Sequence, residues 1–114
     1  MSECIFCKIA SKEIPANIVY EDDLVIAFHD IEPAAPTHII VIPKEHIESL
    51  NHIVDRHKEI LGHIHLCISK IAKNLEIDKK GFRVVNNCGE FGGQTVDHIH
   101  FHLLGGRQMN WPAG

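Results

Sequence analysis

The amino-acid sequence predicts an α+β domain, in which an antiparallel sheet of about five strands carries one long helix and one short helix. Three observations favour this class. A long segment near the middle of the chain has the apolar spacing of an amphipathic helix, and several short segments have apolar or alternating patterns typical of strands. These short segments mostly follow one another in hairpin or meander order. We therefore expect both helices to lie on one face of the sheet.

The short helix is predicted at the beginning of the chain. Ile5, Phe6 and Ile9 have helical spacing, which indicates a helix over residues 5–12. This helix has to end before Pro15, because the residue before a proline avoids the α region.

Five short segments predict the strands. Residues 18–20 and 24–28 read as two strands joined by a polar loop of hairpin length. Residues 39–42 are wholly apolar. Residues 82–85 follow a turn at a glycine, and residues 98–104 alternate between two sets of side chains.

The long helix is predicted to begin near residue 53 and to end at about residue 74, a length of about six turns. Its apolar side chains fall on one stripe, with steps of three and four from Leu61 onward. The residues of the stripe are Ile53, Ile60, Leu61, Ile64, Ile68, Ile71 and Leu75. We interpret His57 as a partly buried histidine of this stripe and assign no function to His52, His63 or His65.

Length and charge limit the classes of function. A chain of 114 residues fits one domain with one modest core. The net charge of −4, from 11 basic and 15 acidic residues, argues against a nucleic-acid binder or a polybasic membrane patch. The N-terminus lacks the pattern of a signal peptide, and no apolar stretch approaches membrane-spanning length. We therefore expect a cytoplasmic protein with no nucleic-acid or membrane partner.

Histidine is the unusual residue of this composition, with ten copies. The period of two in a strand places His98, His100 and His102 on one face, and the apolar residues between them on the other. We expect the three imidazoles to point outward from the core. The preceding segment 89–95 is rich in glycine, so its backbone amides can face an anion. Donors for phosphate oxygens beside a nucleophile are what phosphoryl chemistry needs.

The cysteines divide into a pair and two single residues. Cys4 and Cys7 have the two-residue gap of a zinc half-site, and they fit a metal site or a redox pair better than a structural disulfide. Cys67 and Cys88 have no such neighbour in the sequence.

Several motifs together resemble the histidine-triad nucleotide-binding family, and its Hint branch in particular, over essentially the whole chain. The motifs are Phe-His-Asp-Ile at 28–31, Ala-Pro-Thr-His at 35–38, Val-Ile-Pro-Lys at 41–44, the Gly-Gly-Gln-Thr turn before His-Ile-His-Phe-His-Leu-Leu at 98–104, and Gly-Gly-Arg-Gln-Met-Asn-Trp-Pro at 105–112. The resemblance implies a single domain over residues 1–114 with the family's HIT-like fold. It also implies a homodimer whose two five-stranded sheets join into one continuous ten-stranded sheet, and a C-terminal tail, residues 105–114, that shapes the active site.

The resemblance further implies a hydrolase that cleaves the P–N bond of purine nucleoside 5′-phosphoramidates or aminoacyl-adenylates through a covalent nucleotidyl-histidine. His100 is the implied nucleophile. His102 and His38 match positions that contact the α-phosphate, and Thr95 matches a contact to the phosphate or the leaving group. Asp30 matches the carboxylate that accepts hydrogen bonds from the ribose hydroxyls. The other implied nucleotide contacts are Phe6, Ile9, Phe28, His29, Ile31, Asn87, Gly93, Gln94 and Trp111.

A structural zinc site is implied by the same resemblance. Many bacterial members bind zinc through a set that corresponds to Cys4, Cys7, His46 and His98. Such a site is closed, ties the N-terminal segment to the sheet and removes His98 from the chemistry. No organic cofactor is expected.

Three alternative functions stay open on the sequence. One is a module that binds or senses nucleotides with little turnover. Another is a dinucleoside polyphosphate hydrolase. In the third, the triad itself holds an open-coordinate catalytic zinc.

Overall fold

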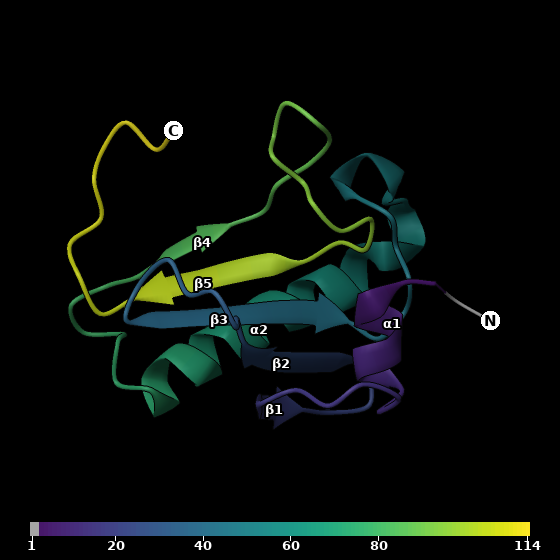
Figure 1. The fold of residues 1–114 in the computed structure, drawn as a ribbon, viewed down its shortest axis with the longest axis horizontal. Coiled ribbons are helices and arrows are strands. Elements are labelled where there is room, and N and C mark those ends of the chain that lie inside the picture. The colour runs from purple at the N-terminus through teal and green to yellow at the C-terminus, as the bar shows by residue number, and fades with distance from the viewer. Residues whose placement is uncertain (1–2) are drawn as a thin grey trace.

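A five-stranded antiparallel sheet forms the centre of the structure, a computed structural model that describes residues 3–114. The strands follow the order β1–β2–β3–β5–β4 across the sheet, and all neighbours pair antiparallel (Figure 1). The predicted α+β class and sheet are therefore confirmed. The helices and strands are α1 (Ile5–Ala10), β1 (Ile18–Glu21), β2 (Val25–His29), β3 (Thr37–Pro43), α2 (Lys58–Asn74), β4 (Arg83–Val85) and β5 (Phe101–Gly105), with two short 3₁₀ helices, η1 (Leu50–His52) and η2 (Asp55–His57).

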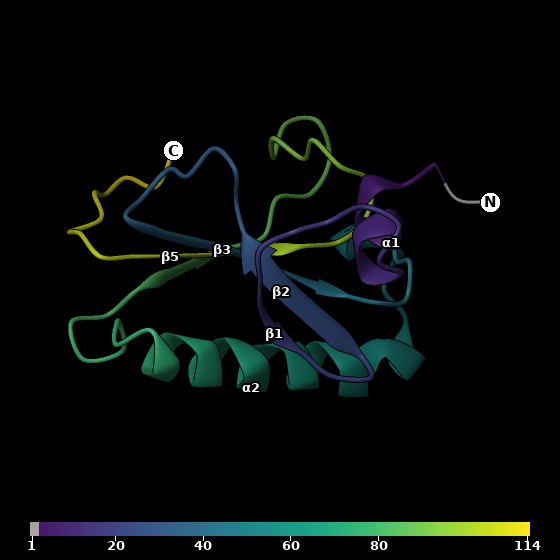
Figure 2. The ribbon, with the colours of Figure 1, turned by 60° about the horizontal axis from the view of Figure 1, so that its bottom comes forward.

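The long helix α2 covers one face of the sheet, where the main core lies (Figure 2). Alternate residues of the strands point toward α2, as the period of two in a strand requires. The apolar stripe of α2 packs against them. The core residues contributed by β2, β3, β5 and α2 are Val25, Ala27, Ile39, Val41, Phe101, Leu103, Ile60, Ile64, Cys67, Ile68, Ile71 and Ala72.

The short helix α1 lies on the opposite face of the sheet, so the expectation that both helices share one face is wrong (Figure 2). Phe6 and Ile9 of α1 form a second core with the other set of side chains from β2 and β3. The reason is visible in these two strands, whose residues are buried at nearly every position. Strands that are apolar on both faces need a cover on both. The strand side chains of this second core are Ile26, Phe28, Ile40 and Ile42.

The long helix is shorter than predicted, because it begins at Lys58 and not near residue 53. Residues before it form η1 and η2, separated by Ile53 and Val54 in an extended conformation. His57 ends η2 and holds this short helix against the residue before it, because its Nδ1 accepts a hydrogen bond from the Val54 amide at 2.9 Å. His57 is buried and has hydrogen-bond partners, as expected, but it precedes the helix and is not part of its stripe.

The last strand is also shorter than predicted, because ladder pairing begins at Phe101 and not at His98. The alternation itself continues upstream, since Ile99 joins the α2-side core with Phe101. The histidines do not point into solvent, which corrects the expectation of outward imidazoles. His98 and His100 are 0% and 3% exposed, because α1 lies over them.

Within the part of the chain that the structure describes, no helix has the length and apolar character needed to cross a bilayer. The short helix and the other four strands lie where they were predicted, to within two residues at each end.

Candidate active site and metal cluster

The α1 side of the sheet brings the predicted catalytic histidines together. Strands β3 and β5 pair in a register that places His102 opposite Ile40, and His38 and His102 project from the same face. The ring of Phe6 in α1 lies edge-on to the ring of His100, with centroids 5.1 Å apart. The rings of His100 and His102 are also 5.1 Å apart. Adjacent strands and the cover of α1 therefore assemble one buried imidazole cluster.

The backbone fixes the tautomer of His100. Its Nδ1 lies 2.8 Å from the carbonyl oxygen of His98. A carbonyl only accepts hydrogen bonds, so the hydrogen of the neutral ring must be on Nδ1, and Nε2 keeps its lone pair. The Asn86 amide also donates to the carbonyl of His100 at 2.9 Å. The ring is thus oriented with a nucleophilic nitrogen available.

A second chain of hydrogen bonds fixes His38 and His102. The backbone amide of Ala34 donates to Nδ1 of His38 at 3.0 Å, so the hydrogen of this ring is on Nε2. That Nε2 lies 2.8 Å from Nδ1 of His102, which must therefore accept. The remaining hydrogen of a neutral His102 is then on its Nε2, as a donor for a substrate oxygen.

Burial keeps this pair of rings neutral. Desolvation lowers the pKa of His38, against the opposing effect of Asp30, whose carboxylate lies 3.4 Å from Nε2 of His38. Desolvation and the neighbouring histidines His100 and His38 lower the pKa of His102 to about 4. At neutral pH both rings are uncharged, as the hydrogen-bond chain requires.

The predicted nucleoside contacts fall into a buried group and a surface group. Phe6 and Phe28 meet edge-to-face with centroids 5.7 Å apart, and Ile9 lies in the same core. His29 is exposed, and Ile31 is 95% exposed. The half-buried Asp30 lies between them in sequence, and its Oδ1 accepts from the Glu32 amide at 2.7 Å. The buried aromatic residues therefore lie beside the histidines, and Ile31 is an exposed apolar side chain at the surface.

The glycine-rich segment forms a loop that its own side chains hold closed. Gln94 accepts from the Gly89 amide at 3.0 Å and donates to the carbonyls of Glu48 and Val96. Asn87 donates to the carbonyl of Gly92 at 2.6 Å. Gly93 has a φ of 80°, a conformation that favours glycine. The loop is thus a preformed turn, and Thr95 is exposed at its end.

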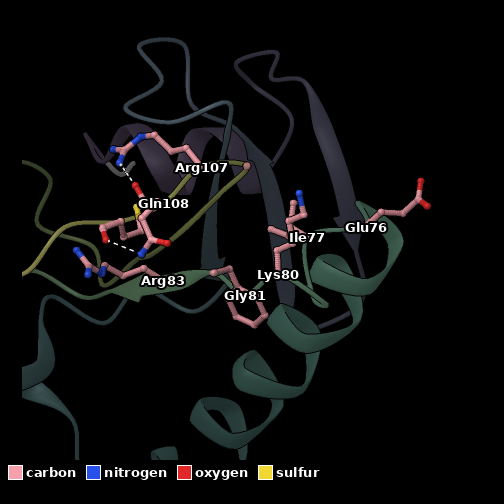
Figure 3. Close-up of a pocket in the computed structure, with 10 residues that line it drawn as sticks. Glu76, Ile77, Lys80, Gly81, Arg83, Arg107 and Gln108 are labelled. Carbon is pink, nitrogen blue, oxygen red and sulfur yellow. Dashed lines mark hydrogen bonds between the residues drawn. The ribbon is translucent and has the colours of Figure 1, made fainter.

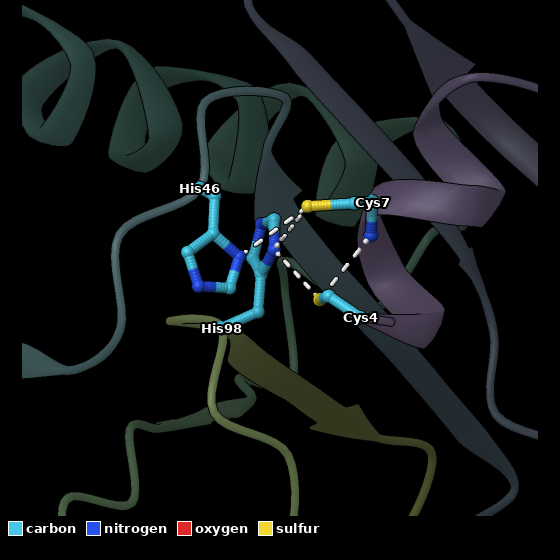
Figure 4. Close-up of side chains that lie close together, drawn as sticks. All are labelled: Cys4, Cys7, His46 and His98. Carbon is cyan, nitrogen blue, oxygen red and sulfur yellow. Dashed lines mark hydrogen bonds between the residues drawn. The ribbon is translucent and has the colours of Figure 1, made fainter. Parts of the chain in front are cut away.

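The four predicted zinc ligands lie together between α1, the loop after β3 and the segment before β5 (Figure 4). The Sγ atom of Cys4 is 3.3 Å from Nδ1 of His98, and Sγ of Cys7 is 3.3 Å from Nδ1 of His46 and 3.5 Å from Nδ1 of His98. All four donor atoms lie within 4.8 Å of one another. The sequence therefore predicted the members of this cluster correctly.

The chemistry of this cluster fits Zn²⁺. Typical Zn–S and Zn–N bonds place tetrahedral sulfur and nitrogen ligands about 3.6 Å apart, close to the distances found here. Nε2 of His98 lies 2.8 Å from the carbonyl of Pro43, so its hydrogen is there and Nδ1 has a lone pair toward the thiols. Burial lowers the pKa of His98 to about 4, which keeps the ring in the neutral form that a metal requires.

The alternative of a catalytic zinc held by all three triad histidines does not match this geometry. Nδ1 of His98 faces the cysteines, Nδ1 of His100 faces a backbone carbonyl, and Nδ1 of His102 faces His38. Among residues 3–114, no potential metal-binding group joins the three rings.

A cavity of about 700 Å³ lies away from the histidines, between the end of α2, the start of β4 and the C-terminal tail (Figure 3). The Arg83 guanidinium donates to the carbonyl of Asn110 at 2.8 Å and fastens the tail there. Among the described residues that line the cavity there is no histidine or cysteine, so it offers no imidazole or thiol for the proposed chemistry. Its lining residues are Glu76, Ile77, Lys80, Gly81, Phe82, Arg83, Gly106, Arg107, Gln108 and Met109.

Sequence reasoning missed the groups that orient the rings. The amide of Ala34 and the carbonyl of Pro43 act through the backbone, so their residue types give no signal. Asn86 is different, because a polar residue at the end of a predicted strand and close to the glycine loop could have been noticed.

Comparisons with known proteins agree with this site. The family model described as the HIT domain matches residues 11–109. The chain is 52% identical to an uncharacterized HIT-like protein of Synechococcus elongatus, and the match covers 100% of both chains. It is 53% identical to a 14 kDa zinc-binding protein of Zea mays, over 99% of this chain and 89% of the maize protein. A solved structure described as a HIT family hydrolase from Legionella pneumophila Philadelphia 1 superposes with a TM-score of 0.97 at 50% identity, covering 98% of this chain and 100% of the other.

Proposed function

This chain belongs to the HIT domain family, and from this premise we propose that it is a hydrolase of purine nucleoside 5′-phosphoramidates or aminoacyl-adenylates. The observation that most supports the proposal is the orientation of His100, whose Nδ1 donates to the His98 carbonyl and leaves Nε2 with a lone pair. A fixed, neutral imidazole is a suitable nucleophile toward phosphorus. The relative described as a HIT family hydrolase supports the reaction class.

The proposed first step forms a bond between Nε2 of His100 and the α-phosphorus. With a phosphoramidate, the P–N bond to the amine breaks, and the amine leaves with its electron pair and takes up one proton. With an aminoacyl-adenylate, the P–O bond to the amino acid breaks, and the carboxylate leaves with its electron pair. Thr95, exposed at the end of the glycine loop, is the proposed relay from solvent for the proton that the amine takes up. Positive charge develops on the ring of His100 in this step, and the carbonyl of His98 stabilises it.

The proposed second step is attack by water on the same phosphorus. The bond from phosphorus to Nε2 breaks and returns its electron pair to His100, while one proton of the water passes to solvent. The products are the nucleoside monophosphate and the free amine, or the free amino acid when the substrate is an aminoacyl-adenylate. In both steps the hydrogen on Nε2 of His102 is the proposed donor to a phosphate oxygen, held in place by His38.

The proposed nucleoside site uses the remaining predicted residues. Phe6, Ile9 and Phe28 would line one side of the base, with His29 and Ile31 at the exposed edge. Asp30 would accept from the ribose hydroxyls. Asn87, Gly93 and Gln94 are proposed to act through the glycine loop, whose closed turn their contacts maintain.

The covalent intermediate gives the direct test of this function. Rapid chemical quench of the protein with adenosine 5′-phosphoramidate, followed by peptide mass spectrometry, is expected to find an adenylyl group on His100. The expectation follows from the tautomer, because Nε2 of this ring is the nitrogen left without a hydrogen. His52 lies outside the cluster and provides an internal control that should stay unmodified. Turnover without any adduct, or an adduct on another residue, would contradict the mechanism.

We also propose that Cys4, Cys7, His46 and His98 hold a structural Zn²⁺. The donor set, the distances and the tautomer of His98 support this, and a relative described as a zinc-binding protein agrees. When bound, the ion would supply a tetrahedral cross-link between α1 and the sheet, with no open coordination position for substrate.

A homodimer with one continuous sheet is a further part of the proposal. Strand β4 is at the edge of the sheet, and its Val84 is exposed. Phe82 beside it and Leu66 on α2 are also exposed apolar residues. An uncovered strand edge is a template for pairing with a second chain. Two copies joined along β4 would bury these side chains.

The C-terminal tail fits the same arrangement. It leaves the sheet at the end of β5 that is remote from α1, as Figure 1 shows. Trp111 is 83% exposed, so it does not pack on its own chain. We propose that residues 105–114 of one copy reach the active site of the other and shape its choice of substrate.

Light scattering after size exclusion is expected to give a dimer for the unaltered protein and a monomer for Val84→Lys. The charge at the strand edge has to lose its hydration if β4 pairs with another β4. Leu24→Lys is the matched control, because Leu24 is equally an exposed apolar residue but lies near the opposite edge of the sheet. A monomer for the unaltered protein, or a dimer that Val84→Lys leaves intact, would contradict pairing along β4.

A further inference from the structure

A second cluster of metal-ligating side chains lies on the α2 face of the sheet, where the proposed function uses no residue. It consists of Asp22 in the turn after β1, and His63 and Cys67 on α2. We call it the β1–α2 cluster. Nε2 of His63 is 2.6 Å from Oδ2 of Asp22, and Sγ of Cys67 is 3.6 Å from Nε2 of His63 and 3.7 Å from Oδ2 of Asp22. One ligand atom from each residue lies within 4.8 Å of the other two.

The fold holds these three side chains in fixed positions. His63 and Cys67 are four residues apart on α2, so they lie on one face of the helix, one turn from each other. Oδ1 of Asp22 accepts from the amides of Leu24 and Val25 at 2.8 and 2.9 Å, and this turns Oδ2 toward the helix. Tyr20 of β1 donates its hydroxyl to the same Oδ2 at 2.7 Å. The cluster is therefore built from two elements that the main core already joins.

We propose that Asp22, His63 and Cys67 form a second binding site for a divalent transition-metal ion of the Zn²⁺ type. Tetrahedral ligation predicts about 3.6 Å between a thiolate sulfur and an imidazole nitrogen and about 3.5 Å between sulfur and a carboxylate oxygen. The distances from Cys67 to His63 and Asp22 agree with these values. Only the Asp22–His63 distance has to open, from a hydrogen bond to about 3.3 Å.

The charges of the site balance a divalent cation. An aspartate and a thiolate contribute two negative charges, and the imidazole is neutral. An ion of charge two with these ligands therefore leaves no net charge at this partly buried site. The hydroxyl of Tyr20 is adjacent as a neutral fourth ligand or as a donor to a metal-bound water.

Binding of the metal has to release a proton. The thiolate is the form of cysteine that binds a metal, so the proton of the Cys67 thiol has to leave when the metal binds. The hydrogen on Nε2 of His63 moves to Nδ1, because His63 is partly exposed and the ring can exchange with water. The proton of the Cys67 thiol thus passes to solvent.

The test is a Co²⁺ titration of the Cys4→Ser/Cys7→Ser protein, in which the other cluster has lost its thiols. We expect one equivalent to bind, with a charge-transfer absorption of a single thiolate. The band should disappear in a variant that also has Cys67→Ala. The matched control is Cys88→Ala, which removes the other single cysteine and should leave the band unchanged.

A second measurement tests the proposal if the Cys4→Ser/Cys7→Ser protein does not fold. In the otherwise unaltered chain, we expect one fewer equivalent of Zn²⁺ per chain in Cys67→Ala than in Cys88→Ala. Equal metal content in these two variants, or a cobalt band that Cys67→Ala leaves unchanged, would overturn the proposal and identify the cluster as a hydrogen-bond network only. Neither readout uses catalysis, so the result does not depend on the proposed function.

Discussion

Replacing His100 by alanine is expected to lower kcat for adenosine 5′-phosphoramidate by on the order of 10⁴-fold or more, as loss of a nucleophile does in other covalent mechanisms. The physical reason is that the other imidazoles are not placed to substitute. Nδ1 of His102 accepts from His38, and the Nδ1 atoms of His98 and His46 face the cysteine thiols. Steady-state kinetics with the purified protein would measure this loss.

The same variant is expected to keep its affinity for adenosine monophosphate within a few fold. The proposed base and ribose contacts, Phe28 and Asp30, lie on β2 and the turn after it and do not depend on His100. Calorimetric titration with the nucleotide separates binding from turnover. Retained nucleotide affinity with lost turnover is informative, because a misfolded variant would lose both nucleotide binding and turnover.

Two further variants test the prediction, one with a smaller expected loss of kcat and one with no expected loss. His102→Asn should cost about 10²- to 10³-fold in kcat, the usual effect of removing one donor to a developing oxyanion. His52→Ala should leave kcat unchanged, since His52 is an exposed residue of η1 with Ser49 and Glu48 as its neighbours. If His100→Ala retained turnover within about tenfold of the unaltered protein, the covalent mechanism would be wrong.

The alternation of the last strand shows what the sequence could predict. A period of two separated the triad from Ile99 and Phe101 without any knowledge of neighbours, and the structure confirms that separation. The spacing of Cys4 and Cys7, together with the resemblance to the HIT family, likewise predicted a four-residue cluster that the fold brings within 4.8 Å. Both predictions rest on short-range geometry or on shared motifs.

Two of the failures, the position of α1 and the burial of His100, depend on contacts between segments distant in the sequence. The position of α1 follows from β2 and β3 being apolar on both faces, which becomes clear only when their place in the middle of the sheet is known. The burial of His100 follows from Phe6, about ninety residues away in the chain. The tautomer of His38 depends on the backbone amide of Ala34, and no residue type in the sequence indicates such a contact.

Removal of the metal proposed to bind at Cys4, Cys7, His46 and His98 is expected to lower the melting temperature of the protein by about 10 °C. At a free Zn²⁺ concentration 100-fold above the dissociation constant, a ligand that binds only the native state contributes about 2.7 kcal/mol, and each kcal/mol corresponds to about 4 °C in a domain of slightly more than 100 residues. The effect should be centred on α1, since a helix of six residues is not stable by itself. Differential scanning fluorimetry with and without a chelator measures the shift.

Loosening of α1 is also expected to reach the active site. Phe6 lies against both His98 and His100, so a displaced α1 would expose the nucleophile to water. We expect kcat to fall on chelation and to recover when Zn²⁺ is restored. Cys4→Ser/Cys7→Ser should have a low melting temperature from the start, with most of its chelator dependence lost, whereas Cys88→Ser should behave as the unaltered protein. Equal melting temperatures for the unaltered protein with and without chelator, after complete loss of metal is verified by elemental analysis, would show that α1 is held by Phe6 and Ile9 alone.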